Sequence, residues 1–355
     1  MSDRKLTDGN DDQTIVPDGA DPGYLPVSAY DIDTFNDILA EEIDSDFTSS
    51  ICCCDDCYED FARRWPGIEL HDVEFQTNAM SVDYCVEQSR LVQLYTAAEL
   101  RTLKRFVVCH RCGTYVRNSI HIFEHPFDRV EEIEQSIDEL ASIGSATPFL
   151  LLEHPFARSI LDAVRDISAD ATPKLMPGTF FRARKSADIA KHDQSLYYVA
   201  TFGPAPPGVI GEGRFNHAGA PMIYLATTLK TVLLEIGTLN ELFSVAELAL
   251  DGAYKILDLV ELDDSSDIRI PILAMANSAL VAAPRIDRGW LRPEYVFSRF
   301  VADCAKSAGF DAIRYASTKS GDGENYVLLS PNSDLRSYLR LISVQETGAA
   351  VAFSK

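Results

Sequence analysis

Two C-x-x-C pairs that lie far apart in the sequence restrict how the first part of this chain can fold. Cys54 and Cys57 form the first pair, and Cys109 and Cys112, followed by Gly113, form the second. Two such pairs can place four thiolates tetrahedrally around Zn²⁺, with each pair on a tight turn. The sequence therefore predicts a structural zinc site that brings these two segments together.

The neighbours of the two pairs leave the ligand set open. Cys52, Cys53 and His110 are rival ligands because they lie directly beside the paired cysteines, and the 51 residues between the pairs exceed the usual spacing of a zinc ribbon. The alternative is that all these cysteines are buried or free thiols. Cys85 and Cys304 stand alone and are typical of small core residues.

The charge of the chain is strongly negative and unevenly distributed. The net charge is -22, and residues 1–60 contain 17 Asp or Glu against only Arg4 and Lys5. Such a surface repels phosphate backbones, so we expect no direct nucleic-acid binding. No run approaches the ~20 apolar residues of a membrane-spanning helix, and the start MSDRKLTDGNDD lacks the apolar segment of a signal peptide. We therefore expect a cytoplasmic protein with reduced thiols and no membrane contact.

The chain divides into two parts with different sequence patterns. Residues 1–28 are rich in Asp, Gly and Pro without sustained periodicity, so we expect a disordered acidic segment. Residues 29–172 repeatedly place apolar residues at helical spacing, which predicts a mainly helical N-terminal domain that carries both cysteine pairs. A run with Pro173, Pro177 and Gly178 marks the boundary to a second domain at 173–345, followed by a tail at 346–355.

Individual elements follow from the same patterns. Helices are expected at 30–47, at 97–104 after the capping box Thr96–Glu99, at 126–143 with Gly144 as its end, and at 155–167. In the second domain a helix is expected at 293–308, and short strands at 179–184, 244–250, 254–260, 312–316 and 325–329. Interspersed short strands and single helices predict an α+β domain with a mixed sheet.

One stretch of the second domain, residues 211–236, combines a glycine-rich loop, a short apolar strand and an amphipathic helix. The loop presents Arg214 and Asn216, the strand presents Tyr224, and the helix presents Glu235. An arginine suits phosphates, a tyrosine suits a flat ring, and a carboxylate suits a developing cation. These residue types within one short stretch indicate a site that cleaves a nucleotide.

The second domain contains five distinctive pieces of sequence: F-F-R-A-R at 180–184, G-R-F-N at 213–216, I-Y-L-A at 223–226, T-V-L-L-E-I at 231–236, and Y-A-S at 315–317 followed by N-Y-V-L-L-S-P. In this order they resemble the RES domain, an NAD-consuming toxin module. The cysteine-bearing part resembles an N-terminal extension found ahead of some RES domains. The resemblance implies a fold similar to ADP-ribosyltransferases of the diphtheria-toxin type, with NAD⁺ held in a cleft between two small sheets.

The resemblance also implies roles for individual residues. The catalytic residues would be Arg182, Tyr224, Glu235 and Ser317, and the residues that contact NAD⁺ would be Arg182, Arg214, Asn216, Tyr224 and Asn325. Two guanidinium groups can clamp a pyrophosphate, and a carboxylate can oppose the positive charge that builds on the ribose as nicotinamide leaves. Arg184 is the alternative to Arg182 as the first of these two arginines. Without the resemblance, a paired structural arginine, an exposed helix glutamate and a core tyrosine are the simpler interpretations.

The hypothesis that follows is an NAD⁺ glycohydrolase that depletes cellular NAD as a bacterial toxin or anti-phage defence effector. Two alternatives stay open: transfer of ADP-ribose to a protein or phosphate acceptor, and a regulatory protein that binds a nucleotide without turning it over. RES domains are usually short toxins neutralised by an antitoxin, and this chain departs from them by its long N-terminal part. Whether its partner is an antitoxin, a trigger protein or a second copy of the chain therefore stays open.

Overall fold

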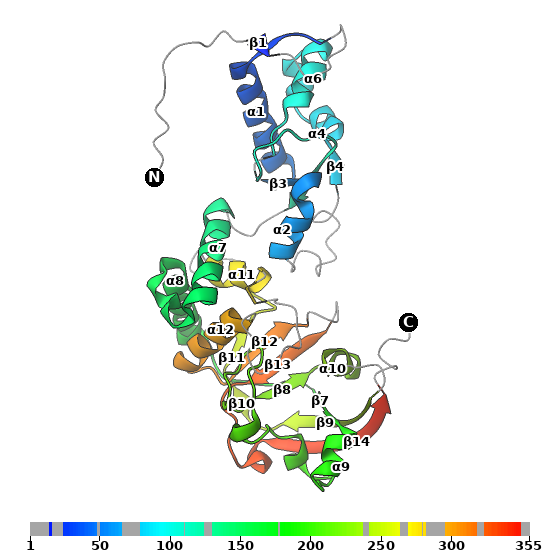
Figure 1. Cartoon of the computed structure of the whole chain (residues 1–355), viewed down its shortest axis with the longest axis vertical. Helices are drawn as coiled ribbons and strands as arrows, with labels where there is room; N and C mark the ends of the chain where they lie inside the picture. The colour runs from blue at the N-terminus through cyan, green and yellow to red at the C-terminus, as the bar shows by residue number, and fades with distance from the viewer. Residues whose placement is uncertain are drawn as a thin grey trace. The chain divides into compact units, whose positions relative to one another are not determined.

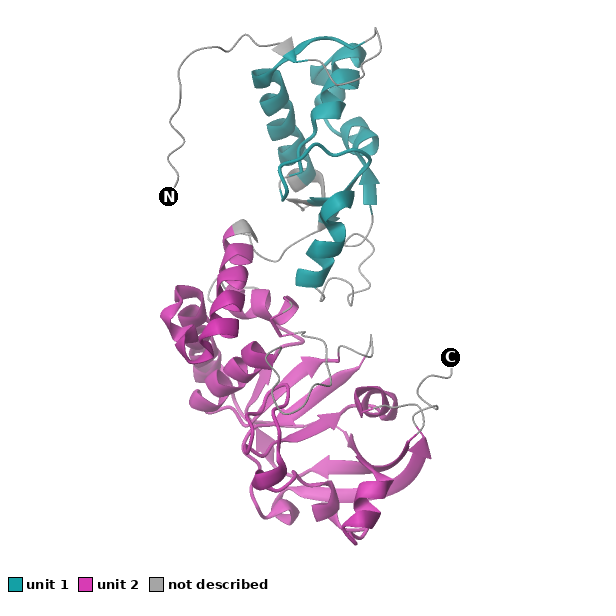
Figure 2. Ribbon diagram, viewed as in Figure 1, with its two compact units in different colours: residues 1–128 teal, residues 129–355 magenta. Residues whose placement is uncertain are grey.

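The computed structural model divides the chain into unit 1, Met1–Asp128, and unit 2, Arg129–Lys355 (Figure 2). It describes residues 14–15, 24–47, 50–65, 79–109, 111–123, 130–176, 178–236, 241–262, 269–278, 280–281, 295–317 and 323–348. Within these ranges, no helix is long and apolar enough to cross a membrane.

Unit 1 is built around the long helix α1 (Ala29–Phe47), as the sequence predicts (Figure 1). Its apolar side chains Phe35, Leu39 and Ile43 recur at helical spacing and are buried. Three shorter helices contact it: α4 (Val82–Gln88), α5 (Leu91–Leu94) and α6 (Ala97–Leu103). The capping box that starts α6 is confirmed, since Thr96 N donates to Glu99 Oε2 at 2.7 Å and Glu99 N donates to Thr96 Oγ1 at 3.4 Å.

A three-stranded antiparallel sheet adds to the helices of unit 1, where the sequence predicted a mainly helical domain. In this sheet β5 (Ser119–Phe123) lies between β3 (Ser50–Cys54) and β4 (Ala79–Ser81), and α2 (Tyr58–Arg64) follows the first cysteine pair. The pairing of Cys54 with Ile120 joins the segments that carry the two cysteine pairs. Strands this short give no usable period-2 pattern, and their partner strands are distant in the sequence. Local sequence patterns therefore do not predict them.

The acidic start of the chain is partly ordered, which corrects the expectation for residues 1–28. Thr14–Ile15 forms β1 and pairs with β2 (Val27–Ser28). The reason is an apolar anchor, because Ile15 packs against the core of unit 1. The rest of the expected disordered segment, apart from residues 24–26, lies outside the described residues.

The boundary between the units lies after Asp128 and not near Pro173. Two helices that the sequence assigned to the N-terminal domain, α7 (Val130–Ala146) and α8 (Pro155–Asp170), therefore belong to unit 2. Their apolar faces find partners there, because both contact α11 (Ile270–Asn277) and α8 also contacts α12 (Val296–Ser307). Helix periodicity shows that a helix has an apolar face, but it does not show which domain covers that face.

Gly144 lies inside α7 and not at its end. Helix α12 approaches α7 closely at this position. A Cβ atom on Gly144 would lie 2.8 Å from Phe297 Cζ and 2.9 Å from Val296 Cγ1. We expect Gly144→Ala to destabilise unit 2 by about 1–3 kcal/mol, since overpacking outweighs the gain in helix propensity. Thermal unfolding measures the change. The matched control is Gly208→Ala, where nothing lies within 4 Å of the added atom; a melting temperature for Gly144→Ala at or above that of the control would contradict the prediction.

Unit 2 is organised around a seven-stranded mixed sheet with the order β11-β12-β13-β8-β7-β9-β14 (Figure 1). Its strands in chain order are β7 (Phe180–Lys185), β8 (Ile223–Ala226), β9 (Leu242–Leu250), β11 (Ile256–Asp258), β12 (Ala312–Ala316), β13 (Glu324–Leu328) and β14 (Leu339–Gly348). The pair β11–β12 is parallel, and the other neighbours are antiparallel. This confirms the predicted α+β class with a mixed sheet.

The sheet is almost divided between β7 and β8. These two strands meet at a single residue pair, Phe181 with Ala226, whereas β7 and β9 pair continuously from Phe180 to Lys185. The sheet therefore separates into β11-β12-β13-β8 on one side and β7-β9-β14 on the other. Helix α10 (Leu229–Ile236) contacts both β7 and β8 at this divergence.

Two of the strands predicted or observed after residue 250 differ between the sequence prediction and the structure. The strand expected at 254–260 is split into β10 (Ala253–Tyr254), which pairs with β6 (Lys174–Leu175), and β11. Strand β14 was not predicted and reaches Gly348, beyond the expected domain end at 345. A bulge between Leu341 and Ser343 interrupts the alternation along β14, so the strand lacks the simple period-2 signal.

Candidate active site

A cavity of about 280 Å³ opens where β7 and β8 diverge. Its walls come from β7, β8, α10, β12, β13, the loop 212–214 and Tyr295. Five of the residues that the sequence predicts for the site line this cavity: Arg182, Arg214, Tyr224, Glu235 and Asn325. Residues that lie far apart in the sequence of unit 2 thus line the same cavity.

Glu235 is oriented by two buried side chains. Ser317 Oγ donates to Glu235 Oε1 at 2.7 Å, and Asn325 Nδ2 donates to the same oxygen at 3.0 Å. Helix α10 buries Val232 and Leu233, which fixes the face that carries Glu235. Ser317 and Asn325 are 1% and 4% exposed, whereas Glu235 is only partly buried. The arrangement therefore presents a carboxylate in a defined orientation at the cavity wall.

Tyr224 and Asn216 use their polar groups to shape the loop that carries Arg214. Tyr224 Oη donates to Asn216 Oδ1 at 2.9 Å and accepts from Phe215 N at 3.1 Å. Asn216 Nδ2 donates to the backbone carbonyls of Gly211 and His217, and Asn216 is buried outside the cavity lining. Asn216 thus supports the loop, while the ring of Tyr224 is available to face a ligand. Burial raises the pKa of Tyr224 to about 12, so its hydroxyl stays protonated.

A glycine is required at position 213 of this loop. A Cβ atom there would lie 2.3 Å from Asn216 Oδ1 and 3.1 Å from Tyr224 Oη. Gly213 N also donates to Asn216 O at 2.9 Å, which closes the turn around Arg214. The glycine in G-R-F-N therefore serves close packing of the loop against β8.

Arg214 lies against two aromatic rings. Its Cζ atom is 5.8 Å from the ring centroids of both Tyr295 and Tyr315, within the range of cation–π attraction. The residue at the start of the loop is held as well, since Glu212 pairs with Arg299 of α12 at 3.3 Å. Helix α12 and strand β12 thereby position the guanidinium group at the cavity.

Arg182 makes contacts that sequence reasoning did not foresee. Its Nη1 donates to Tyr224 O at 2.8 Å and its Nη2 donates to Gly203 O at 3.2 Å, while its Nε is buried without a partner among the described residues. Burial, together with the charge of Arg184, lowers the pKa of Arg182 to about 9, which leaves it cationic at neutral pH. Arg182 thus joins β7 to β8 and brings a positive charge to the cavity wall. Arg184, the rival candidate, bonds Thr201 O and Gly203 O and does not line the cavity.

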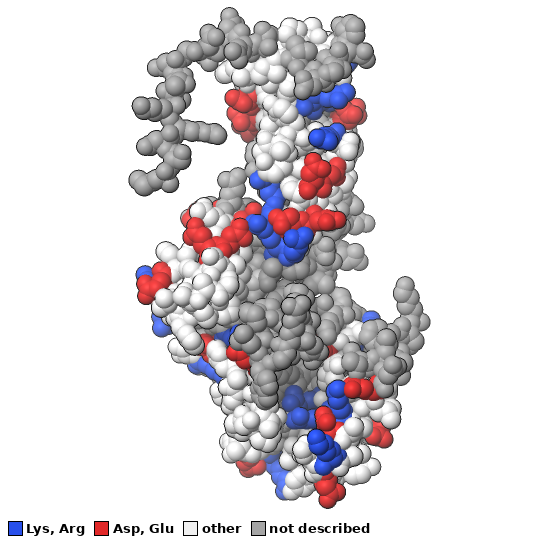
Figure 3. Space-filling model, viewed as in Figure 1, with Lys and Arg blue, Asp and Glu red and all other residues white. Residues whose placement is uncertain are grey.

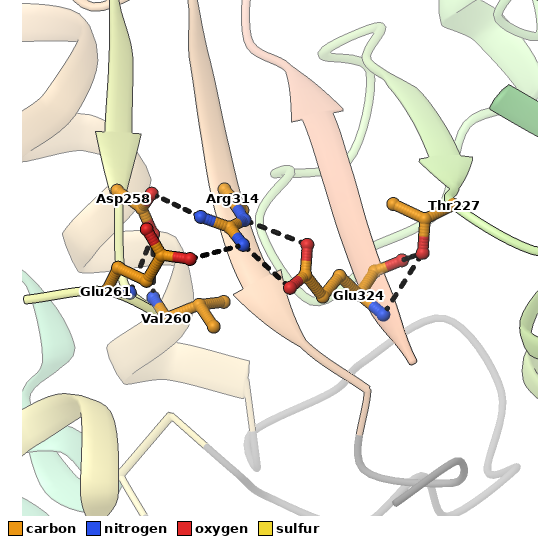
Figure 4. A network of polar contacts seen from close by, with 6 residues as sticks. All are labelled: Thr227, Asp258, Val260, Glu261, Arg314 and Glu324. Atoms are coloured by element: carbon orange, nitrogen blue, oxygen red, sulfur yellow. Dashed lines mark hydrogen bonds and ion pairs between the residues drawn. The ribbon is translucent and has the colours of Figure 1, made fainter. Parts of the chain in front are cut away.

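Arg314 connects the strands behind the site (Figure 4). It binds both carboxylate oxygens of Glu324, at 2.9 and 2.7 Å, and also binds Asp258 at 2.7 Å. Glu324 O accepts from Thr227 N at 3.0 Å, which ties β13 to the residue that directly follows β8. Side chains alternate between the faces of a sheet, so Arg314 and Glu324 lie on the face opposite Tyr315 and Asn325. This cluster fixes the strand ends that support Glu235.

Three charged or aromatic residues of the cavity lining were not assigned to the site from the sequence: Glu212, Tyr295 and Tyr315. Glu212 stands directly before the motif G-R-F-N at 213–216, and Tyr315 is the first residue of the motif Y-A-S at 315–317. Tyr295 precedes α12 and reaches the site only through tertiary packing. The family motifs therefore gave a signal for Glu212 and Tyr315, but none for Tyr295.

The four cysteines predicted as metal ligands come together in unit 1. The Sγ atoms of Cys54, Cys57, Cys109 and Cys112 all lie within 4.8 Å of one another. The Sγ–Sγ distances for Cys54–Cys57, Cys54–Cys112 and Cys57–Cys109 are each 3.7 Å. A tetrahedron with Zn–S bonds of about 2.3 Å has edges of about 3.8 Å, so the donor set fits zinc. Gly113 supports the second turn with a φ of +69°, a conformation that favours glycine.

Of the three rival ligands, the structure describes the side chain of Cys53 alone. Cys53 is buried beside the cluster but is not part of it, and burial raises the pKa of its thiol to about 12. His110 and the side chain of Cys52 lie outside the described residues. The lone cysteines Cys85 and Cys304 are both buried, as expected for small core residues.

Comparison with known proteins supports the resemblance found in the sequence. The family model of the RES domain matches residues 179–343, which confirms a RES domain in unit 2. One solved structure with similarity is the M. tuberculosis MbcT-MbcA toxin-antitoxin complex: the sequence identity is 12%, the match covers 54% of this chain and 96% of that chain, and the TM-score is 0.33. No curated protein matches the chain.

Proposed function

We propose that the RES domain at residues 179–343 is an NAD⁺ glycohydrolase that cleaves the bond between nicotinamide and ribose. The observation that carries the proposal is the Glu235 carboxylate, held by Ser317 and Asn325 at the wall of a cavity that also presents two arginines. The resemblance to RES domains, which are NAD-consuming modules, supports NAD⁺ as the substrate. The cavity, at about 280 Å³, lies just below the usual range for ligand pockets, about 300–1,000 Å³. It therefore suits the nicotinamide riboside end of the dinucleotide.

The chemistry follows from the charge that develops during cleavage. The C1′–N1 bond breaks, its electron pair returns to the pyridinium nitrogen, and nicotinamide leaves as a neutral molecule without a general acid. Positive charge then builds on the ribose, and Glu235 opposes it at close range in a partly buried site. Water bonds to C1′ and loses a proton to give ADP-ribose. Arg214 and Arg182 would neutralise the pyrophosphate, and the Tyr224 ring would contact the nicotinamide.

Two alternatives use the same site. ADP-ribose could pass to a protein or to phosphate instead of water, which needs the same carboxylate and the same bond cleavage. A regulatory protein that binds a nucleotide without turnover is the other alternative. The oriented carboxylate favours catalysis, because a negative charge beside the ribose attracts the cationic sugar of the transition state more strongly than the neutral sugar of bound NAD⁺.

We propose that this activity serves to deplete NAD, as a toxin or anti-phage effector acting in the cytoplasm. The resemblance to RES toxins supports this role and makes a protein antitoxin or a trigger protein the expected kind of partner. A second copy of the chain stays a further candidate.

The test is to incubate the purified full-length protein with NAD⁺ that carries a label in its adenosine part. The expected result is release of free nicotinamide, with the label recovered as ADP-ribose. Label on protein, or as ADP-ribose 1″-phosphate only when phosphate is present, would move the assignment to one of the transferase alternatives. Binding of NAD⁺ without any nicotinamide release would overturn catalysis altogether.

We also propose that unit 1 holds one structural Zn²⁺ through Cys54, Cys57, Cys109 and Cys112. The tetrahedral spacing of the sulfur atoms supports this ligand set. All four positions would be filled by protein ligands, which is typical of a structural and not a catalytic zinc site.

A further inference from the structure

Unit 1 contains a large groove that the proposed NAD⁺ site does not explain. Its volume is about 1,120 Å³, and its walls come from α4, α6 and residues 114–118, with Tyr24 at one side. The cysteine segments build part of the wall, since Asp56 lies within the first pair and Thr114 accepts a backbone hydrogen bond from Cys109. The groove therefore belongs to the folded core of unit 1.

Positive charge is concentrated in this groove. Residues 1–128 contain only ten Lys or Arg against 25 Asp or Glu, yet four of the ten line the groove: Arg101, Lys104, Arg105 and Arg117. Figure 3 shows Lys and Arg side chains gathered over α6 and α4. Lys104 is paired with Asp83 at 2.6 Å, and Arg105 donates to Tyr24 Oη at 3.0 Å. Among the described residues, no ion pair engages Arg101 or Arg117, and both are exposed.

The groove also offers apolar contact surface. Val92, Leu100 and the rings of Tyr24 and Tyr115 border it, whereas the lining valines Val82, Val86 and Val116 are buried in the core behind it. Tyr115 is 49% exposed and Val92 is 44% exposed, so apolar area is accessible beside the arginines. A ligand that fits must therefore combine negative charge with apolar side chains.

The mixture of charges favours a peptide over a nucleic acid. Asp56, Asp83 and Glu87 line the same groove, so a continuous phosphate backbone would meet carboxylates as well as arginines. A peptide has a neutral backbone and can place a few acidic side chains at the arginines and apolar ones at Val92 and Tyr115. Screening over about 8 Å at physiological ionic strength means that these local cations act despite the acidic surface elsewhere.

We propose that this groove is the docking site for a peptide segment of a partner protein that carries acidic side chains next to apolar ones. Arg101 and Arg117 recognise the acidic side chains, and Val92 together with Tyr115 receives the apolar ones. The site belongs to unit 1 and does not depend on the activity proposed for unit 2.

Binding is tested by fluorescence anisotropy with the full-length protein and a fluorescein-labelled synthetic peptide of repeated Glu-Glu-Leu. We expect saturable binding that weakens as salt rises, and no binding of the corresponding Lys-Lys-Leu peptide. The double variant Arg101→Glu/Arg117→Glu should weaken binding by roughly tenfold or more, because each reversal replaces an attraction by a repulsion. Arg101→Gln/Arg117→Gln should give an intermediate loss.

The matched control changes the net charge by the same amount, but at two positions outside the groove. Arg63 and Arg340 are exposed, outside the groove, and paired only weakly with acidic neighbours. Arg63→Glu/Arg340→Glu should bind the peptide within about twofold of the original protein, since distant charges are screened. Equal losses in both double variants, or no saturable binding by the original protein, would overturn the proposal. Displacement of the peptide by oligothymidylate at lower concentration than by unlabelled peptide would also overturn it, in favour of a nucleic-acid site.

Discussion

Replacing Glu235 with glutamine is expected to lower nicotinamide release by roughly 100- to 1,000-fold, the loss typical when one transition-state electrostatic contact is removed. Glutamine keeps the shape of the side chain, and its amide oxygen can still accept from Ser317 and Asn325. What it lacks is the negative charge opposite the ribose. Because that charge matters most when the sugar becomes cationic, kcat should fall while KM changes little.

A steady-state measurement of nicotinamide release at several NAD⁺ concentrations separates kcat from KM. Ser317→Ala tests the support of the carboxylate, since Ser317 acts through Glu235. We expect roughly a tenfold loss in kcat, because one of two hydrogen bonds that orient Glu235 disappears. Glu235→Asp should retain less activity than Ser317→Ala, since the shorter side chain moves the charge away from both donors.

Glu346→Gln is the matched control, because Glu346 lies on β14 outside the cavity lining and loses the same charge. Its activity should equal that of the original protein, and circular dichroism should show all variants folded. Full activity in Glu235→Gln would contradict the assignment of Glu235. A rise in KM with unchanged kcat would instead make Glu235 a residue for substrate binding alone.

The sequence predicted the residues of this site better than it predicted their contacts. The family motifs assign Glu235, Ser317 and Asn325 to one site, but they did not predict that Ser317 and Asn325 donate to Glu235. Arg182 and Asn216 also lie near the site, but their hydrogen bonds go to backbone carbonyls of neighbouring segments. The acceptor of a buried hydrogen-bond donor depends on how distant strands pack. Local patterns in a single sequence do not predict this packing.

The fold shows the same division between local and long-range information. Helix α1 and the capping box of α6 were predictable because periodicity and capping involve residues a few positions apart. The placement of α7 and α8 in unit 2 was not, since it depends on contacts with α11 and α12 more than a hundred residues later. Proline and glycine near Pro173 mark a real turn in the chain, but a turn inside one domain gives the same local signal as a linker between two.

Removing zinc from the site proposed in unit 1 is expected to unfold that unit. Structural zinc contributes about 10–16 kcal/mol of apparent binding energy in zinc-finger peptides, which is comparable with the ~5–15 kcal/mol stability of a whole domain, so we expect unit 1 to lose its fold without the ion. The sheet of unit 1 reinforces this dependence, because β3 and β5 lead into and out of the two cysteine pairs. We expect metal analysis of the purified protein to give one zinc per chain. A chelator or Cys109→Ser should abolish one of two thermal transitions.

The second transition and the NAD⁺ activity should persist in Cys109→Ser, because the cavity and its supporting residues all lie in unit 2. Cys53→Ala is the matched control: Cys53 is a buried neighbour of the cluster outside the four-sulfur set, so its variant should keep a full complement of zinc. Loss of zinc in Cys53→Ala would show that the ligand set includes Cys53. An unchanged first transition after complete removal of zinc would show that helix packing around α1 is sufficient, and that the clustered thiols do not hold the unit together.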